Sequence, residues 1–69
     1  MKTTKIKGYT VEFTTNDDAS NCFIEKGKFF SSLAVAMDLG ILEDREGKEH
    51  KISECVVDEI YEWALAQGY

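Results

Sequence analysis

The residues of this 69-residue chain that are best suited to chemistry are one histidine and two cysteines, and their spacing argues against a shared site. His50 lies between Glu49 and Lys51 in a strongly charged segment. A general base or a metal ligand needs partners that converge in a cleft. Cys22 and Cys55 are far apart, and neither belongs to the close cysteine pair that is typical of zinc sites. We therefore expect a surface histidine, two reduced cysteines, and neither a metal nor another cofactor.

The chain also lacks the sequence motifs of common enzymes. It contains no GxxxxGK[ST], GxGxxG or HExxH pattern. Its 69 residues provide one small core, which is too little for a doubly wound or barrel enzyme. The longest apolar run, 33–37, is too short for a membrane span, and the basic start leads into no apolar signal segment. We expect a single cytoplasmic domain over 1–69 without enzymatic activity.

The net charge of −5 is distributed unevenly along the chain. Residues 1–35 carry five lysines and four acids, a net charge of +1, whereas residues 36–69 carry three bases and nine acids, a net charge of −6. An acidic half repels nucleic acid and anionic membranes and attracts basic surfaces. The expected partner is therefore a host protein with a basic surface, and neither a membrane nor nucleic acid.

Much of this acidic charge falls on one side of a helix expected over 54–67. Ser53 is a good N-cap, and Gly68 follows the last helical residue. At about 100° per residue, three carboxylates spaced four apart form a stripe opposite the apolar side. These carboxylates belong to Glu54, Asp58 and Glu62.

Two apolar residues flank this acidic stripe and suggest a binding surface. Tyr61 and Leu65 lie at its edge, and tyrosine is enriched at binding hot spots, where surrounding charges tune the rate of association. The alternative is that Tyr69 or a neighbouring hairpin covers Leu65 and that the acids only confer solubility.

A second acidic cluster is expected in a hairpin. Segments 41–44 and 48–52 flank the turn 45–47, whose Gly47 suits a left-handed position. Its carboxylates are those of Glu43, Asp44, Glu46 and Glu49, and the first three belong to the predicted partner-binding surface. If this cluster and the helix share one face, seven carboxylates would imitate the phosphate spacing of a nucleic acid, and binding would weaken steeply with salt.

The first half of the chain is expected to be mostly strand. Apolar and polar residues alternate over 5–15, with a bulge at Gly8 restoring the parity of Ile6. A hairpin is predicted from 22–25 and 28–30, with a Lys26-Gly27 turn that places Glu25 opposite Lys28 and Ile24 beside Phe29. The alternative is a helix capped by Asn16, with Asp17 and Asp18 in its first turn, ending at Gly27.

A short helix is expected over 32–39, capped by Ser31 and ended by Gly40. It is apolar nearly all round, which predicts burial under the sheet or against a second chain.

Together these elements predict an α+β domain in the order β-β-β-α-β-β-α, with a small antiparallel sheet packed on one face by both helices. The predicted core is Tyr9, Val11, Phe13, Phe23 or Ile24, Phe29 or Phe30, Leu33, Met37, Ile41, Val56, Ile60 and Trp63.

In size, acidity and lack of a catalytic site, the chain resembles small phage and mobile-element accessory proteins such as anti-defence and anti-CRISPR inhibitors. That resemblance implies a non-enzymatic module that inhibits or modulates a host protein. The alternative is a structural or regulatory subunit that forms a homodimer through the helix at 32–39. A third hypothesis, nucleic-acid binding, would use four lysines with two aromatic residues, and the net charge disfavours it. These residues are Lys2, Lys5, Lys7, Lys28, Tyr9 and Phe13.

Overall fold

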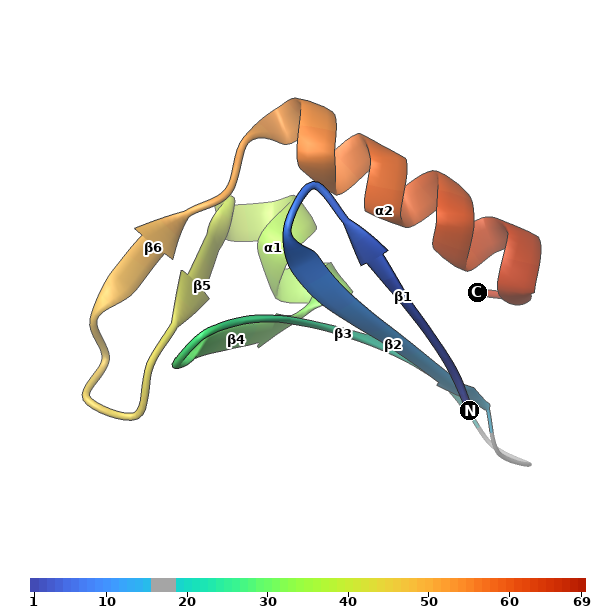
Figure 1. Cartoon of the computed structure of the whole chain (residues 1–69), viewed down its shortest axis with the longest axis horizontal. Helices are drawn as coiled ribbons and strands as arrows, with labels where there is room; N and C mark the ends of the chain where they lie inside the picture. Colours follow the sequence, from blue (N-terminus) through green and yellow to red (C-terminus); the bar gives the residue numbers. More distant parts are fainter. Residues whose placement is uncertain (16–18) are drawn as a thin grey trace.

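The computed structural model describes residues 1–15 and 19–69, which form one six-stranded antiparallel sheet and two helices (Figure 1). The strand order across the sheet follows the order in the chain. The elements are β1 (Lys2–Ile6), β2 (Tyr9–Thr15), β3 (Ser20–Lys26), β4 (Phe29–Ser32), α1 (Leu33–Leu39), β5 (Ile41–Glu43), β6 (Glu49–Lys51) and α2 (Glu54–Gln67).

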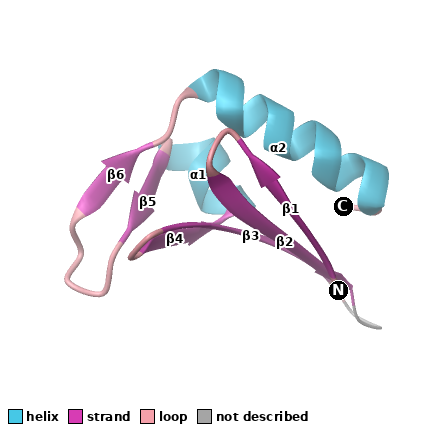
Figure 2. Ribbon diagram, viewed as in Figure 1, coloured by secondary structure: helices cyan, strands magenta, loops and turns pink. Residues whose placement is uncertain are grey.

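Both helices lie on the same side of the curved sheet (Figure 2). The short helix α1 contacts β3, β4, β5 and α2, whereas α2 lies over β1 and β2. The expected α+β class with two helices on one face is therefore confirmed. The element order differs by one strand, because four strands precede α1 instead of three.

The additional strand arises at Gly8, where a tight turn replaces the expected bulge. Ile6 pairs with Tyr9, so Lys7 and Gly8 form a two-residue loop. Both have positive φ, 51° and 86°, as a type I′ hairpin turn requires. Residues opposite each other in an antiparallel pair share a face, so the hairpin places Ile6 and Tyr9 on the same side as the bulge would have done.

The second hairpin forms as predicted, but its turn lies one residue later, which shifts the strand pairing by two residues. Gly27 and Lys28 form the loop, with Gly27 at φ 60°, and Lys26 pairs with Phe29. As a result, Glu25 pairs with Phe30 instead of Lys28, and Ile24 pairs with Ser31 instead of lying beside Phe29. The helix alternative is wrong for Ser20–Lys26, which is strand. Its proposed start at Asn16, Asp17 and Asp18 lies outside the described residues.

The cap of α1 lies one residue later than expected. Ser32, not Ser31, accepts a hydrogen bond from the N–H of Val35 (3.2 Å). Gly40 ends the helix at φ 68°, and its N–H donates to the carbonyl of Ala36 (2.9 Å).

Only one side of α1 is buried in this chain, whereas its apolar composition predicted a buried helix. Leu33 and Ala36 are buried, whereas Met37 is 49% exposed and Leu39 is 59% exposed. Met37 is therefore not a core residue. Two helical turns resting on a sheet direct only one arc of side chains inward.

The core lies between the inner face of the sheet and the helices. Ile24 belongs to it and Phe23 does not, while Phe29 packs against it and Phe30 is exposed. Val56 and Trp63 are only partly buried, as is Ile41. The buried apolar residues are Tyr9, Val11, Phe13, Cys22, Ile24, Leu33, Ala36, Leu42, Ile52, Val57, Ile60 and Ala64.

Candidate functional site

The acidic stripe of α2 has the geometry of an available binding surface. Ser53 caps the helix by accepting from the N–H of Val56 (3.4 Å), which positions all the residues that follow. The apolar side of the helix is buried against the sheet. Glu54, Asp58 and Glu62 of the stripe are exposed, and the first two line a hollow together with Met37 and Leu39 of α1. Among residues 1–15 and 19–69 the one salt bridge is elsewhere, so these three carboxylates have no basic partner there.

The two apolar residues beside the stripe differ in exposure. Leu65 is 46% exposed, so the C-terminal residue leaves it open. Tyr61 is half-buried against the core, and the Tyr69 ring meets it edge to face with 6.3 Å between ring centres. The binding surface on α2 therefore offers one open apolar side chain and one that is held in place.

Asp44, which we included in the predicted acidic surface, is occupied within the β5–β6 turn. Its side chain is 5% exposed, and Oδ1 accepts hydrogen bonds from the N–H groups of Glu46 (2.9 Å) and Lys48 (2.8 Å). Lys28 lies 3.6 Å from the other oxygen. Burial opposes the charge of Asp44, but the two hydrogen bonds and Lys28 outweigh it and lower the pKa of the carboxyl below its usual range. Asp44 therefore stabilises the turn, and the exposed acids of this hairpin are Glu43, Glu46 and Glu49.

The two acidic clusters do not form one surface. In Figure 1 the β5–β6 turn projects at the end of the molecule away from α2, and α2 extends in the other direction. Since Asp44 is also buried, the seven carboxylates do not make a continuous imitation of phosphates.

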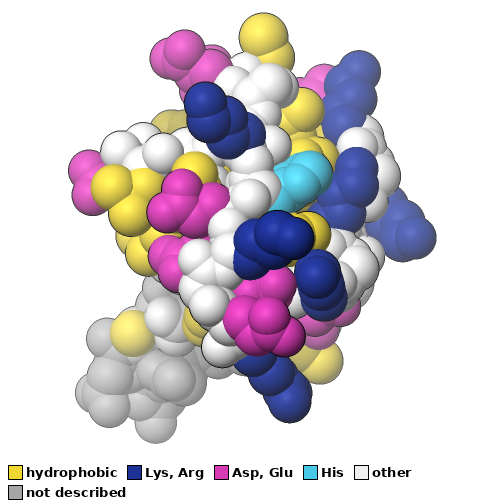
Figure 3. All heavy atoms as spheres, turned by 90° about the vertical axis from the view of Figure 1, so that its left-hand side faces the viewer, with side chains coloured by type: hydrophobic (Ala, Val, Ile, Leu, Met, Phe, Trp, Pro, Cys, Tyr) yellow, Lys and Arg dark blue, Asp and Glu magenta, His cyan; other side chains and the backbone are white. Residues whose placement is uncertain are grey.

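His50 is half-buried, not fully on the surface as expected. Its Nε2 forms a hydrogen bond with the Tyr9 hydroxyl (3.1 Å), and its ring lies 5.2 Å from that of Phe29. The Lys26 ammonium lies 4.6 Å from the Tyr9 ring centre. Figure 3 shows the histidine at the surface among lysine and arginine side chains. These contacts join side chains of β2, β4 and β6, and they give His50 a packing role.

The cysteines and histidine do not converge on a metal site. Cys22 is buried and Cys55 is exposed, and both lie in the described part of the chain without a disulfide. Burial raises the pKa of the Cys22 thiol to about 11, which makes it a poor nucleophile or ligand. Within the described residues, no group of three or more His, Cys, Asp or Glu side chains is placed to hold a metal ion.

The aromatic residues proposed for nucleic-acid stacking are unavailable to bases. Tyr9 is 6% exposed and Phe13 is 4% exposed, because both point into the core from β2. The lysines of β1 and of the β1–β2 and β3–β4 turns are exposed. Neither Tyr9 nor Phe13 offers an open ring beside them on which a base could stack.

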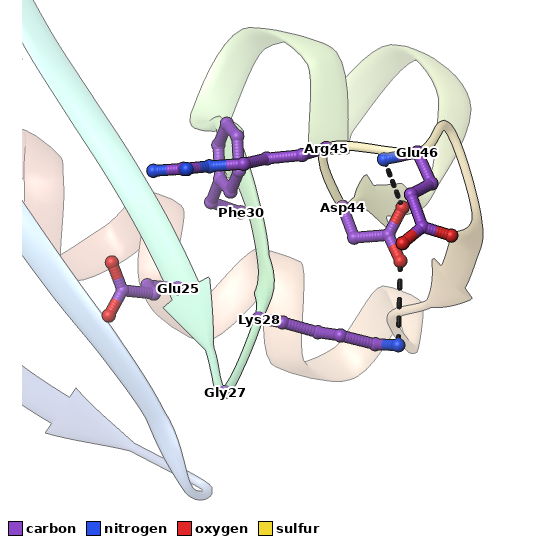
Figure 4. Close-up of a pocket in the computed structure, with 7 residues that line it drawn as sticks. All are labelled: Glu25, Gly27, Lys28, Phe30, Asp44, Arg45 and Glu46. Carbon is purple, nitrogen blue, oxygen red and sulfur yellow. Dashed lines mark hydrogen bonds and ion pairs between the residues drawn. The ribbon is translucent and has the colours of Figure 1, made fainter.

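The residues that sequence reasoning missed lie on the outer face of the sheet. Phe23 and Phe30 are half-exposed there, at 48% and 51%. Phe30 lines a hollow of about 450 Å³ with Glu25 and Arg45 (Figure 4). The alternation of side chains along a strand could have predicted the exposure of Phe23. When Cys22 and Ile24 point into the core, Phe23 between them must point outward.

Comparisons with protein-family models, with curated proteins and with solved structures find no match. Among the described residues, no helix is long and apolar enough to cross a membrane.

Proposed function

We propose that the protein is a non-enzymatic, cytoplasmic binding module of the phage or mobile-element accessory type, which inhibits or modulates a host protein. The observation that carries this proposal is the row of carboxylates on α2. They are exposed, they have no basic partner among the described residues, and they lie beside the half-exposed Leu65.

The acidic stripe would guide a basic partner surface toward α2, and apolar contact would then hold it. Opposite charges across an interface raise the association rate and select the orientation, whereas desolvated apolar contacts slow dissociation. Leu65 supplies such a contact, and Tyr61 is already ordered by the core and by Tyr69. Inhibition would follow from covering the partner's surface, which requires no chemistry from this chain.

Charge reversal on α2 tests the proposal. The triple variant Glu54→Lys, Asp58→Lys, Glu62→Lys should capture its partner from a host lysate at least tenfold less well, because attraction becomes repulsion. A matched pair of single variants makes the test specific to the stripe. Asp58→Lys and Glu59→Lys alter neighbouring exposed acids of the same helix, and only the first lies on the stripe. Undiminished capture by a triple variant with an unchanged circular dichroism spectrum would contradict the proposal.

The second candidate function is a structural or regulatory subunit that forms a homodimer. The observation in its favour is the apolar side of α1, where Val35, Met37 and Leu39 are exposed. A strictly monomeric chain at micromolar concentration would remove this candidate.

A further inference from the structure

The outer face of the sheet combines aromatic and acidic side chains in two rows that follow from the strand register. One row runs Glu12, Phe23 and Ser32 across β2, β3 and β4. The other runs Glu25, Phe30 and Glu43 across β3, β4 and β5. Paired residues of antiparallel strands point to the same side. We call the surface formed by Phe23, Phe30, Glu12, Glu25 and Glu43 the aromatic-acidic face.

The two phenyl rings of this face are uncovered. Both helices pack on the opposite side of the sheet (Figure 2), and Val35 of α1 is the one described helix residue that lines a hollow with Phe23 and Phe30. Two adjoining hollows, of about 190 and 390 Å³, are each lined by both rings. Paired exposed aromatic side chains on an otherwise polar sheet face mark an interaction site more often than isolated apolar residues do.

The charge around the rings determines what kind of partner fits. Among the described residues that line the hollows, Lys28 is paired with Asp44, which leaves Arg45 as the one free base. Lys5 lies farther along the row of Glu25, beyond Thr10. Four exposed acids line the same hollows as Arg45 and the rings, namely Glu12, Glu25, Glu43 and Glu46. The surface therefore favours a cation.

Arginine fits this surface better than lysine does. A guanidinium group is planar, stacks on a phenyl face and binds a carboxylate through two hydrogen bonds, whereas an ammonium is a compact, strongly hydrated charge. In Figure 4 the chain's own Arg45 extends across the hollow that Phe30 and Glu25 line. We propose that the aromatic-acidic face binds an arginine-rich segment of a partner protein. This surface is separate from the stripe on α2, and the proposal does not depend on it.

The test uses a synthetic peptide of alternating arginine and serine, with the whole chain labelled for NMR. We expect the peptide to shift the amide signals of β3 and β4, and a peptide with lysine in place of arginine to bind several-fold more weakly. The variant Phe23→Thr, Phe30→Thr keeps good strand formers at both positions and should lose about 4- to 25-fold in affinity, from about 2- to 5-fold per exposed ring.

Two further variants keep the result independent of misfolding. Arg45→Gln removes the competing guanidinium and should strengthen binding about 2- to 5-fold, which an unfolded protein cannot do. Leu65→Ser alters the surface on α2 and should leave the peptide affinity unchanged. This control separates failure of the present proposal from failure of the one on α2.

Several results would overturn the proposal. They are equal binding of the lysine peptide, unchanged affinity of the double phenylalanine variant, weaker binding by Arg45→Gln, and peptide shifts that avoid β3 and β4. A dimer in sedimentation that the phenylalanine variant abolishes would identify a second copy as the occupant and would overturn it as well.

Discussion

Asp44 illustrates how, at the scale of single residues, the same carboxyl group can serve binding or folding. Its charge and its place in a polar hairpin made it a candidate for partner binding. In the structure, its oxygens satisfy two backbone N–H groups of the turn and pair with Lys28. Those contacts favour the ionised form and lower the pKa of the carboxyl, despite burial. The carboxylate is therefore engaged within the chain and unavailable to a partner.

This pKa shift predicts a specific pH dependence of stability. Because the pKa of Asp44 is lower in the folded state than the unfolded value of about 3.9, the carboxylate stabilises the fold above that value. The contribution is lost as the pH falls through the folded pKa. Asp44→Asn should lower the free energy of unfolding near neutral pH, and its difference from the wild type should shrink as the solution becomes strongly acidic.

Urea denaturation across this pH range checks the prediction. Glu46→Gln is the control, since it removes an exposed carboxylate from the same turn and should keep the wild-type dependence. If the difference in free energy of unfolding between Asp44→Asn and the wild type stays constant with pH, that result would contradict the role assigned to Asp44.

At the scale of elements, α1 shows how a helix of apolar composition divides between core and surface. It begins at its Ser32 cap, ends at Gly40, and spans only seven residues. Leu33 is fully buried, whereas Met37 on the next turn is half-exposed. The composition suggested that both belong to the core, and the docking of α1 on β3, β4 and β5 separates them.

Alanine substitutions in α1 should therefore differ strongly in cost. Leu33→Ala should lower the free energy of unfolding by about 2–5 kcal/mol, because it opens a cavity in a fully buried site. That is a large share of the roughly 3–10 kcal/mol expected for a chain of this size. Met37→Ala should change it by less than about 1 kcal/mol. Urea titration of both variants measures this difference, and equal losses would show that the docking of α1 differs from the structure.

At the scale of the whole molecule, the net charge of −5 becomes a set of separate surfaces. The stripe on α2 shares no residue with the aromatic-acidic face, whereas Glu43 and Glu46, the acids near the β5–β6 turn, line the hollows of that face. The two proposed binding surfaces therefore do not overlap. A small chain can thus contact a partner on more than one side, and this suits a protein that acts by covering surfaces.

The oligomeric state tests how the whole molecule acts. The proposed binding module should sediment as a monomer at micromolar concentration. A dimer would instead support the structural-subunit alternative, provided that Met37→Ser, Leu39→Ser dissociates it. Ala34→Ser changes an exposed residue of the same helix and serves as the control. A dimer that persists in the double variant would show that α1 is not its interface.

Features that depend only on neighbouring residues follow directly from the amino-acid pattern. Ser53 caps the start of α2 and Gly68 caps its end, as predicted, because capping needs only residues within one helical turn. The stripe of Glu54, Asp58 and Glu62 follows equally from helical periodicity. The α+β class followed from the succession of such local patterns.

The tertiary structure sets the register of the strands and the orientation of side chains that could point to either face of an element. Gly27 fits more than one two-residue turn. Moving that turn by one residue along the chain changes which side chains lie opposite each other, and in the structure it places Phe30 opposite Glu25. Which of Phe29 and Phe30 points inward, and whether Asp44 faces solvent or its own turn, depends on elements distant in the chain. The aromatic-acidic face exists because these long-range pairings bring four strands together with both helices on the other side.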